Sequence, residues 1–345
     1  MPQDRLQHFL SRLVSREDLN REEAGQLLDV LLGANATDSQ IAGALIALAA
    51  KGETVEELTG MALGLRARAV HVDSGHQCFI DTAGTGSSRV KTFNISTAAA
   101  FVIAGAGLPV AKHGNRAASS KSGSADVLAA LGVNVSALPK VSEGCLKEIG
   151  ICFMFAPLYH GATARVAGIR RELGVHTTFN LLGPLSNPAG APRQIVGVWR
   201  KDLVERLAKV LAALGTECAW VVHGEDGLDE ITLAGKTFVA EAKDGRVRSF
   251  EVEPADFGLQ GHALDHLRGG DTDANGHIVR EVIVGSRRDE ARALVIMTAA
   301  AALVVGGVVN DLREAVTLAE QSIDSGAAAT KLELLIHATN SAGER

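Results

Sequence analysis

From residue 76 onwards, the sequence alternates short apolar segments with longer segments of helical pattern. The apolar segments lie at 79–80, 108–111, 151–155, 195–199 and 219–222. This alternation is typical of βαβ units, in which helices connect parallel strands. Ligands of such folds bind beyond the carboxyl ends of the strands. The sequence therefore predicts an α/β fold with a mainly parallel sheet and a ligand site along one edge of it.

The first 75 residues have a different pattern, that of short helices with defined starts. Asn20, Thr37 and Thr54 are each followed by Glu or Gln three residues later, which is the arrangement of a capping box. Gly52 is expected to end the helix that starts after Thr37. We therefore expect a small all-helical domain at 1–75 and an α/β domain at 76–345.

A glycine-rich turn follows the first predicted strand. It reads DTAGTGSS over 81–88 and precedes a predicted helix at 98–106. Bare backbone amides and a helix N-terminus attract anions, but glycine also marks ordinary turns. Arg89 excludes the dinucleotide-binding pattern, and the Gly-Lys-Ser/Thr that closes a Walker A loop is missing. On its own, the turn leaves both interpretations open.

A second polar segment follows the next predicted strand. It reads KHGNRAASSKSGSAD over 112–126 and leads into a predicted helix at 125–131. Its three cations, its hydroxyl groups and its glycine amides are the groups that bind a polyphosphate. A solvated polar loop is the alternative. Two possible anion-binding segments at successive strand ends indicate a phosphate site more strongly than either one does alone.

An acidic segment follows the strand predicted at 219–222. It contains Glu225, Asp226, Asp229 and Glu230, whose hard oxygen atoms suit Mg²⁺. For Glu225 and Asp226, a metal site and an acidic surface turn are equally good interpretations. The spacing is not that of an EF-hand, because the spaced acidic ligands and the closing Glu are missing.

A fourth candidate is Arg170, which lies on a predicted helix before the loop at 178–189. The planar guanidinium group can donate two parallel hydrogen bonds to a substrate carboxylate. An arginine on a helix is also commonly a solvated surface residue. The residue type alone does not decide between these roles.

The composition of the chain excludes several classes of function. Its 345 residues favour two domains, and its net charge of −6 argues against nucleic-acid binding. The apolar stretch at 293–309 is alanine-rich and is expected to be a buried helix rather than a membrane span. The charged N-terminus does not resemble a secretory signal. The four cysteines form no Cys-x-x-Cys pair, so we expect reduced thiols and a cytoplasmic protein.

The four motifs, in this order, resemble those of the anthranilate phosphoribosyltransferases over about residues 6–335. The resemblance implies a small helical domain, joined by a helical segment near 165–190, and a larger α/β domain of the nucleoside phosphorylase and phosphoribosyltransferase type. It also implies a homodimer formed through the helical domain. The implied reaction transfers phosphoribose from phosphoribosyl pyrophosphate to the amine of anthranilate. The products are N-(5-phosphoribosyl)anthranilate and pyrophosphate, in tryptophan biosynthesis.

The resemblance also implies the residues of the site. Contacts to phosphoribosyl pyrophosphate are expected from Gly84, Ser87, Ser88, Thr92, Asn94, Ile95, Ser96, Thr97, Lys112, His113, Gly114, Asn115, Arg116, Ala117, Ala118, Ser119, Ser120 and Ser124. Ser96, Asp229 and Glu230 are expected to hold Mg²⁺, as two ions. Asn115 and Arg170 are expected to contact anthranilate, and His160 is expected to line the substrate entrance. The sequence contains no recognisable nucleophilic triad. His113 is either an acid/base or positioning group, or a histidine hydrogen-bonded within its loop.

Four positions depart from the pattern of the family. Ser87-Ser88 replaces Gly-Asp in the glycine-rich turn, His176 replaces an arginine, and Gly161 replaces the proline usual after His160. These changes leave room for altered metal use or an altered acceptor. Two alternatives stay open, a pyrimidine-nucleoside phosphorylase, which shares the fold, and a non-catalytic homologue, which only Ser87-Ser88 suggests. The intact 112–126 segment and Arg170 favour the transferase.

Overall fold

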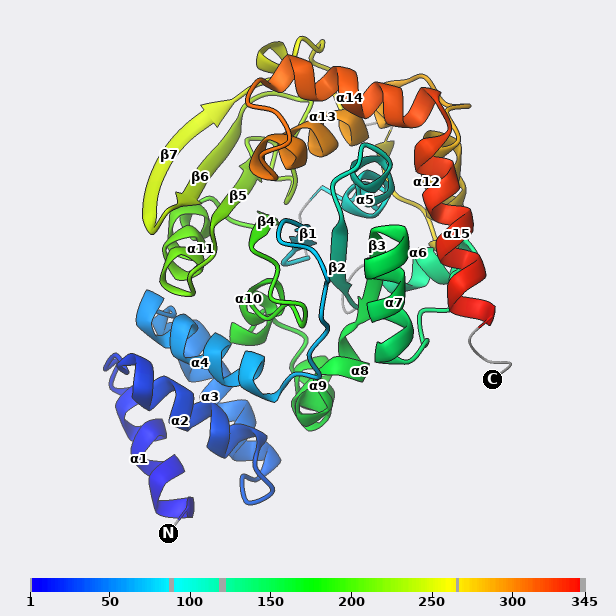
Figure 1. Cartoon of the computed structure of the whole chain (residues 1–345). Coiled ribbons are helices and arrows are strands. Elements are labelled where there is room, and N and C mark those ends of the chain that lie inside the picture. The colour runs from blue at the N-terminus through cyan, green and yellow to red at the C-terminus, as the bar shows by residue number, and fades with distance from the viewer. Residues whose placement is uncertain (1, 87–89, 118–121, 265–266, 342–345) are drawn as a thin grey trace.

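The computed structural model describes residues 2–86, 90–117, 122–264 and 267–341. The chain forms an N-terminal helical bundle beside a larger α/β part that contains one seven-stranded sheet (Figure 1). The bundle, blue in Figure 1, packs at one end of the molecule, and the C-terminal helices cover the other. The predicted combination of a helical domain and an α/β domain with a mainly parallel sheet is confirmed.

Four helices form the bundle: α1 (Pro2–Val14), α2 (Arg21–Leu32), α3 (Asp38–Lys51) and α4 (Val55–Arg68). The three predicted capping boxes are present at Asn20, Thr37 and Thr54, each of which accepts from the backbone N–H three residues later. Gly52 ends α3 with a φ of 85°, a conformation that strongly favours glycine. Two helices from later in the chain, α9 (Ala164–Leu173) and α10 (Thr178–Leu185), pack against α2, α3 and α4.

The sheet has the strand order β3-β2-β1-β4-β5-β6-β7. Its parallel strands follow the predicted apolar segments and are β1 (Ile80–Gly84), β2 (Val110–Gly114), β3 (Ile151–Phe155), β4 (Arg193–Gly197) and β5 (Cys218–Gly224). β1 and β2 extend into residues that were expected in turns. β1 continues through Asp81 to Gly84, and β2 continues through Lys112 to Gly114. These polar residues were expected in turns, but buried hydrogen-bond partners on neighbouring elements allow them to lie inside the sheet.

Two further strands, β6 (Thr237–Lys243) and β7 (Arg246–Val252), were not predicted. They form a hairpin that adds to β5 in antiparallel orientation. β7 is mostly polar because it is the edge strand and most of its residues face solvent. The sheet is therefore mixed, with its parallel part at the side where the predicted motifs lie.

The remaining helices cover the sheet and its edges: α5 (Ile95–Gly105), α6 (Ser124–Ala130), α7 (Pro139–Ile149), α8 (Ala156–Tyr159), η1 (Gly161–Thr163), α11 (Asp202–Ala213), η2 (Pro254–Phe257), α12 (Thr272–Ile283), α13 (Glu290–Val305), α14 (Leu312–Asp324) and α15 (Ala327–Ser341). The predicted helices at 98–106 and 125–131 correspond to α5 and α6. The apolar stretch at 293–309 corresponds to the buried helix α13, which ends before Gly306. Among the described residues, no helix is long and apolar enough to span a membrane.

Two hydrophobic clusters lie on opposite faces of the sheet. One cluster contains α5, α13 and residues such as Ile195 and Val222. The other contains the bundle helices, α11 and the strand residues of opposite orientation, such as Val196 and Val221. Successive side chains of a strand point to opposite faces, so the central strands supply both clusters. The helical bundle therefore shares one continuous core with a face of the sheet.

Candidate active site

The carboxyl ends of β2, β1, β4 and β5 lie side by side, because these strands are parallel neighbours. Gly84 at the end of β1 pairs in register with Gly197 at the end of β4. The glycine-rich turn, the 112–126 segment and the acidic segment all lie at this edge. The structure thus brings the acidic segment at 225–230 to two motifs that lie about a hundred residues or more before it in the sequence.

The acidic segment packs directly against the end of β4. A Cβ added to Gly197 would lie 1.7 Å from the backbone oxygen of Asp229, so only glycine allows this approach. The Thr85 N–H donates to the Gly197 oxygen at 2.9 Å. A Cβ on Gly84 would lie 3.9 Å from the Asp229 carboxylate. The glycines at the two strand ends therefore give the acidic segment its place beside the glycine-rich turn.

Lys112 is the buried cation of the site. Its ammonium group donates to the backbone oxygen of Thr82 at 2.6 Å and to the Ser96 hydroxyl at 3.4 Å. Burial lowers the pKa of Lys112, whereas the carboxylates of Asp81 and Glu230 raise it. The side chain thus connects β2 to β1 and to the start of α5.

Glu230 lies close to the same serine. Burial and the neighbouring Asp229 raise the pKa of Glu230 to about 8, while Lys112 and hydrogen bonds from Ser96 favour the charged carboxylate. A nearby divalent cation would reverse this shift, because opposite charge stabilises the ionised form.

The Ser96 hydroxyl and the carboxylates of Asp229 and Glu230 form a set of hard oxygen donors that fits Mg²⁺. Within the described part of the chain, His, Cys, Asp and Glu side chains form no group of three or more that could hold a metal ion. The protein would therefore supply part of the coordination shell. Water and substrate phosphates usually supply the rest for this metal.

The N-terminus of α5 faces this edge. Asn94 is the N-cap residue, and Ile95, Ser96 and Thr97 form the first turn. The Thr97 hydroxyl is buried and has no hydrogen-bond partner among the described residues. Thr92 lies just before this turn and pairs with Arg268 in an isolated β-bridge. A helix start attracts anions, although in this turn the Ile95 and Thr97 N–H groups already donate to the backbone oxygens of Phe93 and Asn94, at 2.9 and 3.1 Å.

Asp126 organises the described part of the 112–126 segment. Its carboxylate accepts from the backbone N–H groups of Ala117 and Gly123, each at 3.0 Å, and forms an ion pair with Arg116 at 2.8 Å. Ser124 begins α6, and its hydroxyl donates to the Asn115 oxygen at 3.4 Å. The predicted contacts at Ser87, Ser88, Ala118, Ser119 and Ser120 lie outside the described residues.

Gly114 allows the segment to fold back on itself. A Cβ at this position would lie 2.2 Å from the Ser124 hydroxyl. The described ends of the segment therefore meet at the edge of the sheet.

His113 and His160 form a buried pair. Their ring centroids are 5.1 Å apart, and His113 Nε2 and both ring nitrogens of His160 have no hydrogen-bond partner within the described residues. Burial and the neighbouring His160 lower the pKa of His113 to about 3, and burial lowers the pKa of His160. Both rings are therefore neutral at pH 7. A hydrogen bond with the backbone of Gly183 raises the pKa of His113, so the ring is held by the neighbouring helix α10 rather than by its own loop.

Arg170 lies near the C-terminus of α9, partly buried against α10. Its guanidinium group donates to the Asn180 side chain at 3.2 Å and lies 5.8 Å from the centre of the Phe179 ring. Burial lowers the pKa of Arg170 from its ordinary value. The side chain is thus an oriented, partly desolvated cation. A carboxylate ligand suits such a group.

The other two acidic residues brace their own turn. Asp226 accepts from the Leu228 N–H at 3.1 Å and from the Thr232 hydroxyl at 2.9 Å, while Glu225 accepts from the Lys236 N–H at 3.2 Å. Of the two interpretations, the structure favours the local turn. Asp229 and Glu230 remain the candidate metal ligands.

Sequence reasoning missed the buried residues beneath the site. Asp81, Thr82 and Asn187 contact Lys112, His113 or the backbone of β2. The sequence predicts Asp81 in a turn and Asn187 in a loop marked by glycine and proline. A buried carboxylate in a strand has no local sequence signal, because its partners come from distant segments.

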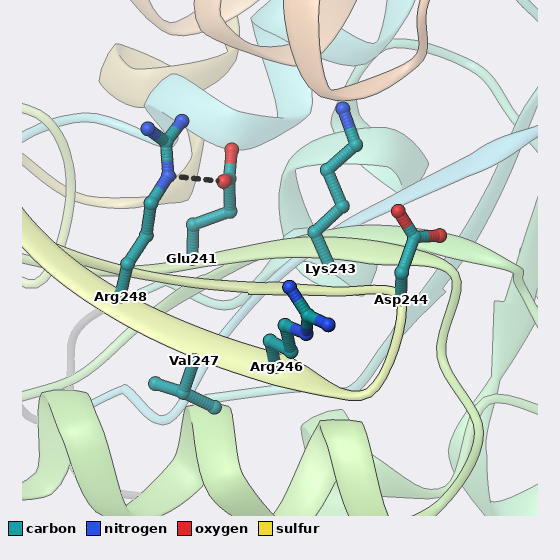
Figure 2. Close-up of a pocket in the computed structure, with 6 residues that line it drawn as sticks. All are labelled: Glu241, Lys243, Asp244, Arg246, Val247 and Arg248. Atoms are coloured by element: carbon teal, nitrogen blue, oxygen red, sulfur yellow. Dashed lines mark hydrogen bonds and ion pairs between the residues drawn. The ribbon is translucent and has the colours of Figure 1, made fainter.

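A hollow outside this site lies at the β6–β7 hairpin. Figure 2 shows its lining residues, which are Glu241, Lys243, Asp244, Arg246, Val247 and Arg248. The Arg248 guanidinium pairs with the Glu241 carboxylate at 2.6 Å. None of the predicted site residues lines this hollow, and we assign no function to it.

Comparison with known proteins agrees with this geometry. A model of the glycosyl transferase family, a/b domain, matches residues 76–329, and a model of the helical bundle domain of the same family matches residues 7–69. The anthranilate phosphoribosyltransferase of Anaeromyxobacter dehalogenans is 53% identical over 97% of this chain and 98% of its own length. That of Moorella thermoacetica is 49% identical over 95% and 96%.

Solved structures agree over the same length. The anthranilate phosphoribosyltransferase of Thermus thermophilus has a TM-score of 0.90 at 36% identity, covering 96% of this chain and 99% of that one. The Saccharomyces cerevisiae enzyme, solved with phosphoribosyl pyrophosphate and Mg, has a TM-score of 0.88 at 28% identity, covering 97% and 98%. By its sequence and its fold, this chain belongs to the anthranilate phosphoribosyltransferase family.

Proposed function

We propose that this chain transfers the phosphoribosyl group of phosphoribosyl pyrophosphate to the amine of anthranilate at the edge formed by β2, β1, β4 and β5. The products are N-(5-phosphoribosyl)anthranilate and pyrophosphate, and the reaction belongs to tryptophan biosynthesis. One observation carries the assignment to this edge. Two anion-binding turns, a set of oxygen donors for Mg²⁺ and a buried lysine meet there.

Phosphoribosyl pyrophosphate binds to the glycine-rich turn, the start of α5 and the 112–126 loop. The helix start at Asn94–Thr97 and the unpartnered Thr97 hydroxyl support this choice, because a helix N-terminus attracts phosphate. The predicted contacts on Gly84, Thr92, Lys112, Gly114 and Asn115 all belong to the same edge or to the loop that leaves it. Arg116 takes part by exchanging its Asp126 partner for a phosphate.

Mg²⁺ is held by Ser96, Asp229 and Glu230 together with oxygens of the substrate, and we assign two ions to the site. When bound, the metal neutralises negative charge on the pyrophosphate group. The solved structure of the Saccharomyces cerevisiae relative contains both phosphoribosyl pyrophosphate and Mg. The donor set of Ser96, Asp229 and Glu230 supports the same ligands here.

The reaction forms a bond from the anthranilate nitrogen to the anomeric carbon and breaks the bond from that carbon to the pyrophosphate oxygen. The electron pair of the broken bond leaves with pyrophosphate, and the amine loses a proton. The protein needs no nucleophile for this step. Its part is to hold the two substrates in line and to stabilise the departing charge.

Anthranilate binds with its carboxylate on Arg170 and with Asn115 beside it. Arg170 supplies an oriented cation from α9. The ring of His113 is neutral and buried, and its pKa of about 3 makes it a weak base. We therefore assign it to position the acceptor, while the proton that the amine releases passes to water. His160 packs on the His113 ring at the approach to the site.

The helical domain provides the contact for a homodimer. It comprises residues 1–75 and is joined by the segment near 165–190, while residues 76–345 carry the catalytic domain. Exposed apolar side chains of the bundle, namely Val14, Ile46 and Leu63, support this choice. The four free cysteines support a reducing, cytoplasmic environment. Light scattering would test the dimer, and a monomer at micromolar concentration would refute it.

Loss of anthranilate fluorescence tests the activity. The purified chain should consume anthranilate only when both phosphoribosyl pyrophosphate and Mg²⁺ are present. Release of free base from thymidine and phosphate would instead favour a nucleoside phosphorylase. Absence of turnover with either substrate pair would favour a non-catalytic homologue.

A further inference from the structure

Asp81 is a fully buried carboxylate in the middle of β1. One carboxylate oxygen accepts from the backbone N–H of His113 at 3.2 Å, and the other accepts from the Asn187 side-chain amide at 2.7 Å. Carboxylates are almost never fully buried unless they are paired or hydrogen-bonded. The fold thus buries a carboxylate, whose desolvation costs free energy, directly beneath the residues that begin the 112–126 loop.

Asn187 is buried as well, and its side chain joins three segments. Its amide group donates to Asp81 and to the backbone oxygen of Ala111 at 2.9 Å, and its oxygen accepts from the Ala189 N–H at 2.9 Å. The amide nitrogen and the amide oxygen of Asn187 are therefore both hydrogen-bonded inside the protein. Neither Asn187 nor Asp81 is among the residues implied by the family resemblance.

The hydrogen bonds of Asp81 with Asn187 and with His113 form a bridge, and the position of Asn187 in the chain shows which elements this bridge connects. Asn187 lies just after α10, and Asn180 of α10 accepts a hydrogen bond from Arg170. Asp81, at the other end of the bridge, binds the backbone of His113, next to Lys112. The hydrogen bonds through Asn187 and Asp81 therefore connect the segment that follows α10, the helix beside Arg170, with β2, the strand that carries Lys112.

We propose that Asp81 and Asn187 are positioning residues that fix β2 relative to α10, and thereby fix the two substrates relative to each other. This inference rests on the proposed function, in which Lys112 and Arg170 belong to the sites of different substrates. These residues would act on the reaction by aligning the reacting atoms. Transfer between two bound substrates depends steeply on the alignment of the reacting atoms, whereas the binding of each alone does not.

The chemistry of the bridge explains why residue 81 is a carboxylate. The groups that face it are hydrogen-bond donors, namely the backbone N–H groups of His113 and Thr82 and the Asn187 amide, and the Lys112 charge also stabilises it. An ionised carboxylate is acceptor-only and suits all of them. In Asp81→Asn, the amide group of the new side chain would face either Asn187 or a backbone N–H, donor against donor. In the double variant Asp81→Asn with Asn187→Asp, the contact between the two side chains becomes donor to acceptor again, while a carboxylate oxygen replaces the donor to the Ala111 oxygen.

The test measures kcat and both Michaelis constants for the two single variants and the double variant. Asp81→Asn should lower kcat by about tenfold or more, while each Michaelis constant stays within about threefold of the parent, since a lost alignment acts on the transition state. The double variant should recover a substantial part of kcat. Thr298→Val is the matched control, because it removes a buried hydroxyl whose hydrogen bond, to the Leu294 oxygen, stays within α13.

Several outcomes would overturn the inference. These are an unchanged kcat in Asp81→Asn, a loss no larger than that in Thr298→Val at equal loss of thermal stability, or a double variant worse than both single variants. If Asp81→Asn does not fold, Asn187→Ala takes its place with the same expectation for kcat.

A failure of the proposed function would look different, because the parent chain itself would not consume anthranilate. In that case, amide hydrogen exchange of residues 110–117 provides the readout. Faster exchange in Asp81→Asn than in Thr298→Val would support the positioning role, and equal exchange would overturn it.

Discussion

Removal of the Arg170 guanidinium should separate the two substrates kinetically. In Arg170→Ala the anthranilate carboxylate loses its cationic partner, while the anion-binding turns at the sheet edge stay intact. Hydrogen bonds to charged groups contribute about 1.5–3 kcal/mol each, and a bidentate contact makes two of them. Arg170 is only partly buried, so water replaces some of the lost interaction. We therefore expect a net loss of about 2–4 kcal/mol, which is roughly a 30- to 1,000-fold fall in kcat/KM for anthranilate.

Steady-state assays with each substrate varied in turn would measure this effect. The Michaelis constant for phosphoribosyl pyrophosphate should stay within about threefold of the parent, because Arg170 contributes to the acceptor site only. Arg171→Ala is the matched control, since Arg171 follows Arg170 on the same helix and its side chain is exposed. Its kinetics should equal those of the parent.

An acceptor without a carboxylate extends the test to the substrate side. Aniline retains the amine but lacks the group that Arg170 is proposed to bind. Parent and Arg170→Ala should therefore use aniline with similar kcat/KM, both at a low rate. Equal losses for aniline and anthranilate would refute the carboxylate contact, and so would equal rises in both Michaelis constants.

Three further predictions concern the edge of the sheet. Gly197→Ala should displace the Asp229 backbone and raise the Mg²⁺ concentration needed for half-maximal rate, and an unchanged magnesium titration would contradict the packing described above. Asp229→Asn combined with Glu230→Gln should lower turnover by about a hundredfold or more while the protein stays folded, because the metal loses its charged ligands; near-parental activity would remove both residues from the site. In the folded protein the pKa of His113 is lowered to about 3, below the pKa of about 6.5 in an unfolded chain. As the pH falls below about 6.5, the unfolded chain therefore binds the proton first, and the free energy of unfolding decreases. Between pH 6.5 and 5 the free energy of unfolding should fall by about 2 kcal/mol more in the parent than in His113→Gln, and parallel urea-unfolding profiles would show that His113 titrates normally.

The elements that local sequence patterns encode were predictable. Capping boxes use residues only three positions apart, so the starts at Asn20, Thr37 and Thr54 could be read directly and are present. Apolar runs located the five parallel strands, because strands covered by helices on both faces are apolar throughout. The order of the motifs along the chain then placed the site at the carboxyl ends of these strands.

Features that depend on distant partners could not be predicted in this way. The strand ends at Asp81 and Lys112 contain polar residues, and only contacts across the sheet show that they are buried. β7 lacks an apolar run because it is an edge strand. The hydrogen bond between Asp81 and Asn187 joins residues 106 positions apart. No local pattern specifies such a pair.

The shared core of the bundle and the sheet has a consequence for synthesis on the ribosome. The apolar faces of α1 to α4 are complete only when they meet Val166 on α9, Phe179 on α10 and Leu207 on α11. At about 5–20 residues per second, the ribosome needs roughly 7–30 seconds to extend the chain from the end of α4 to the end of α11. During that interval the nascent bundle exposes apolar surface. We therefore expect chaperones that bind nascent chains to occupy this segment and to leave it once α11 has emerged.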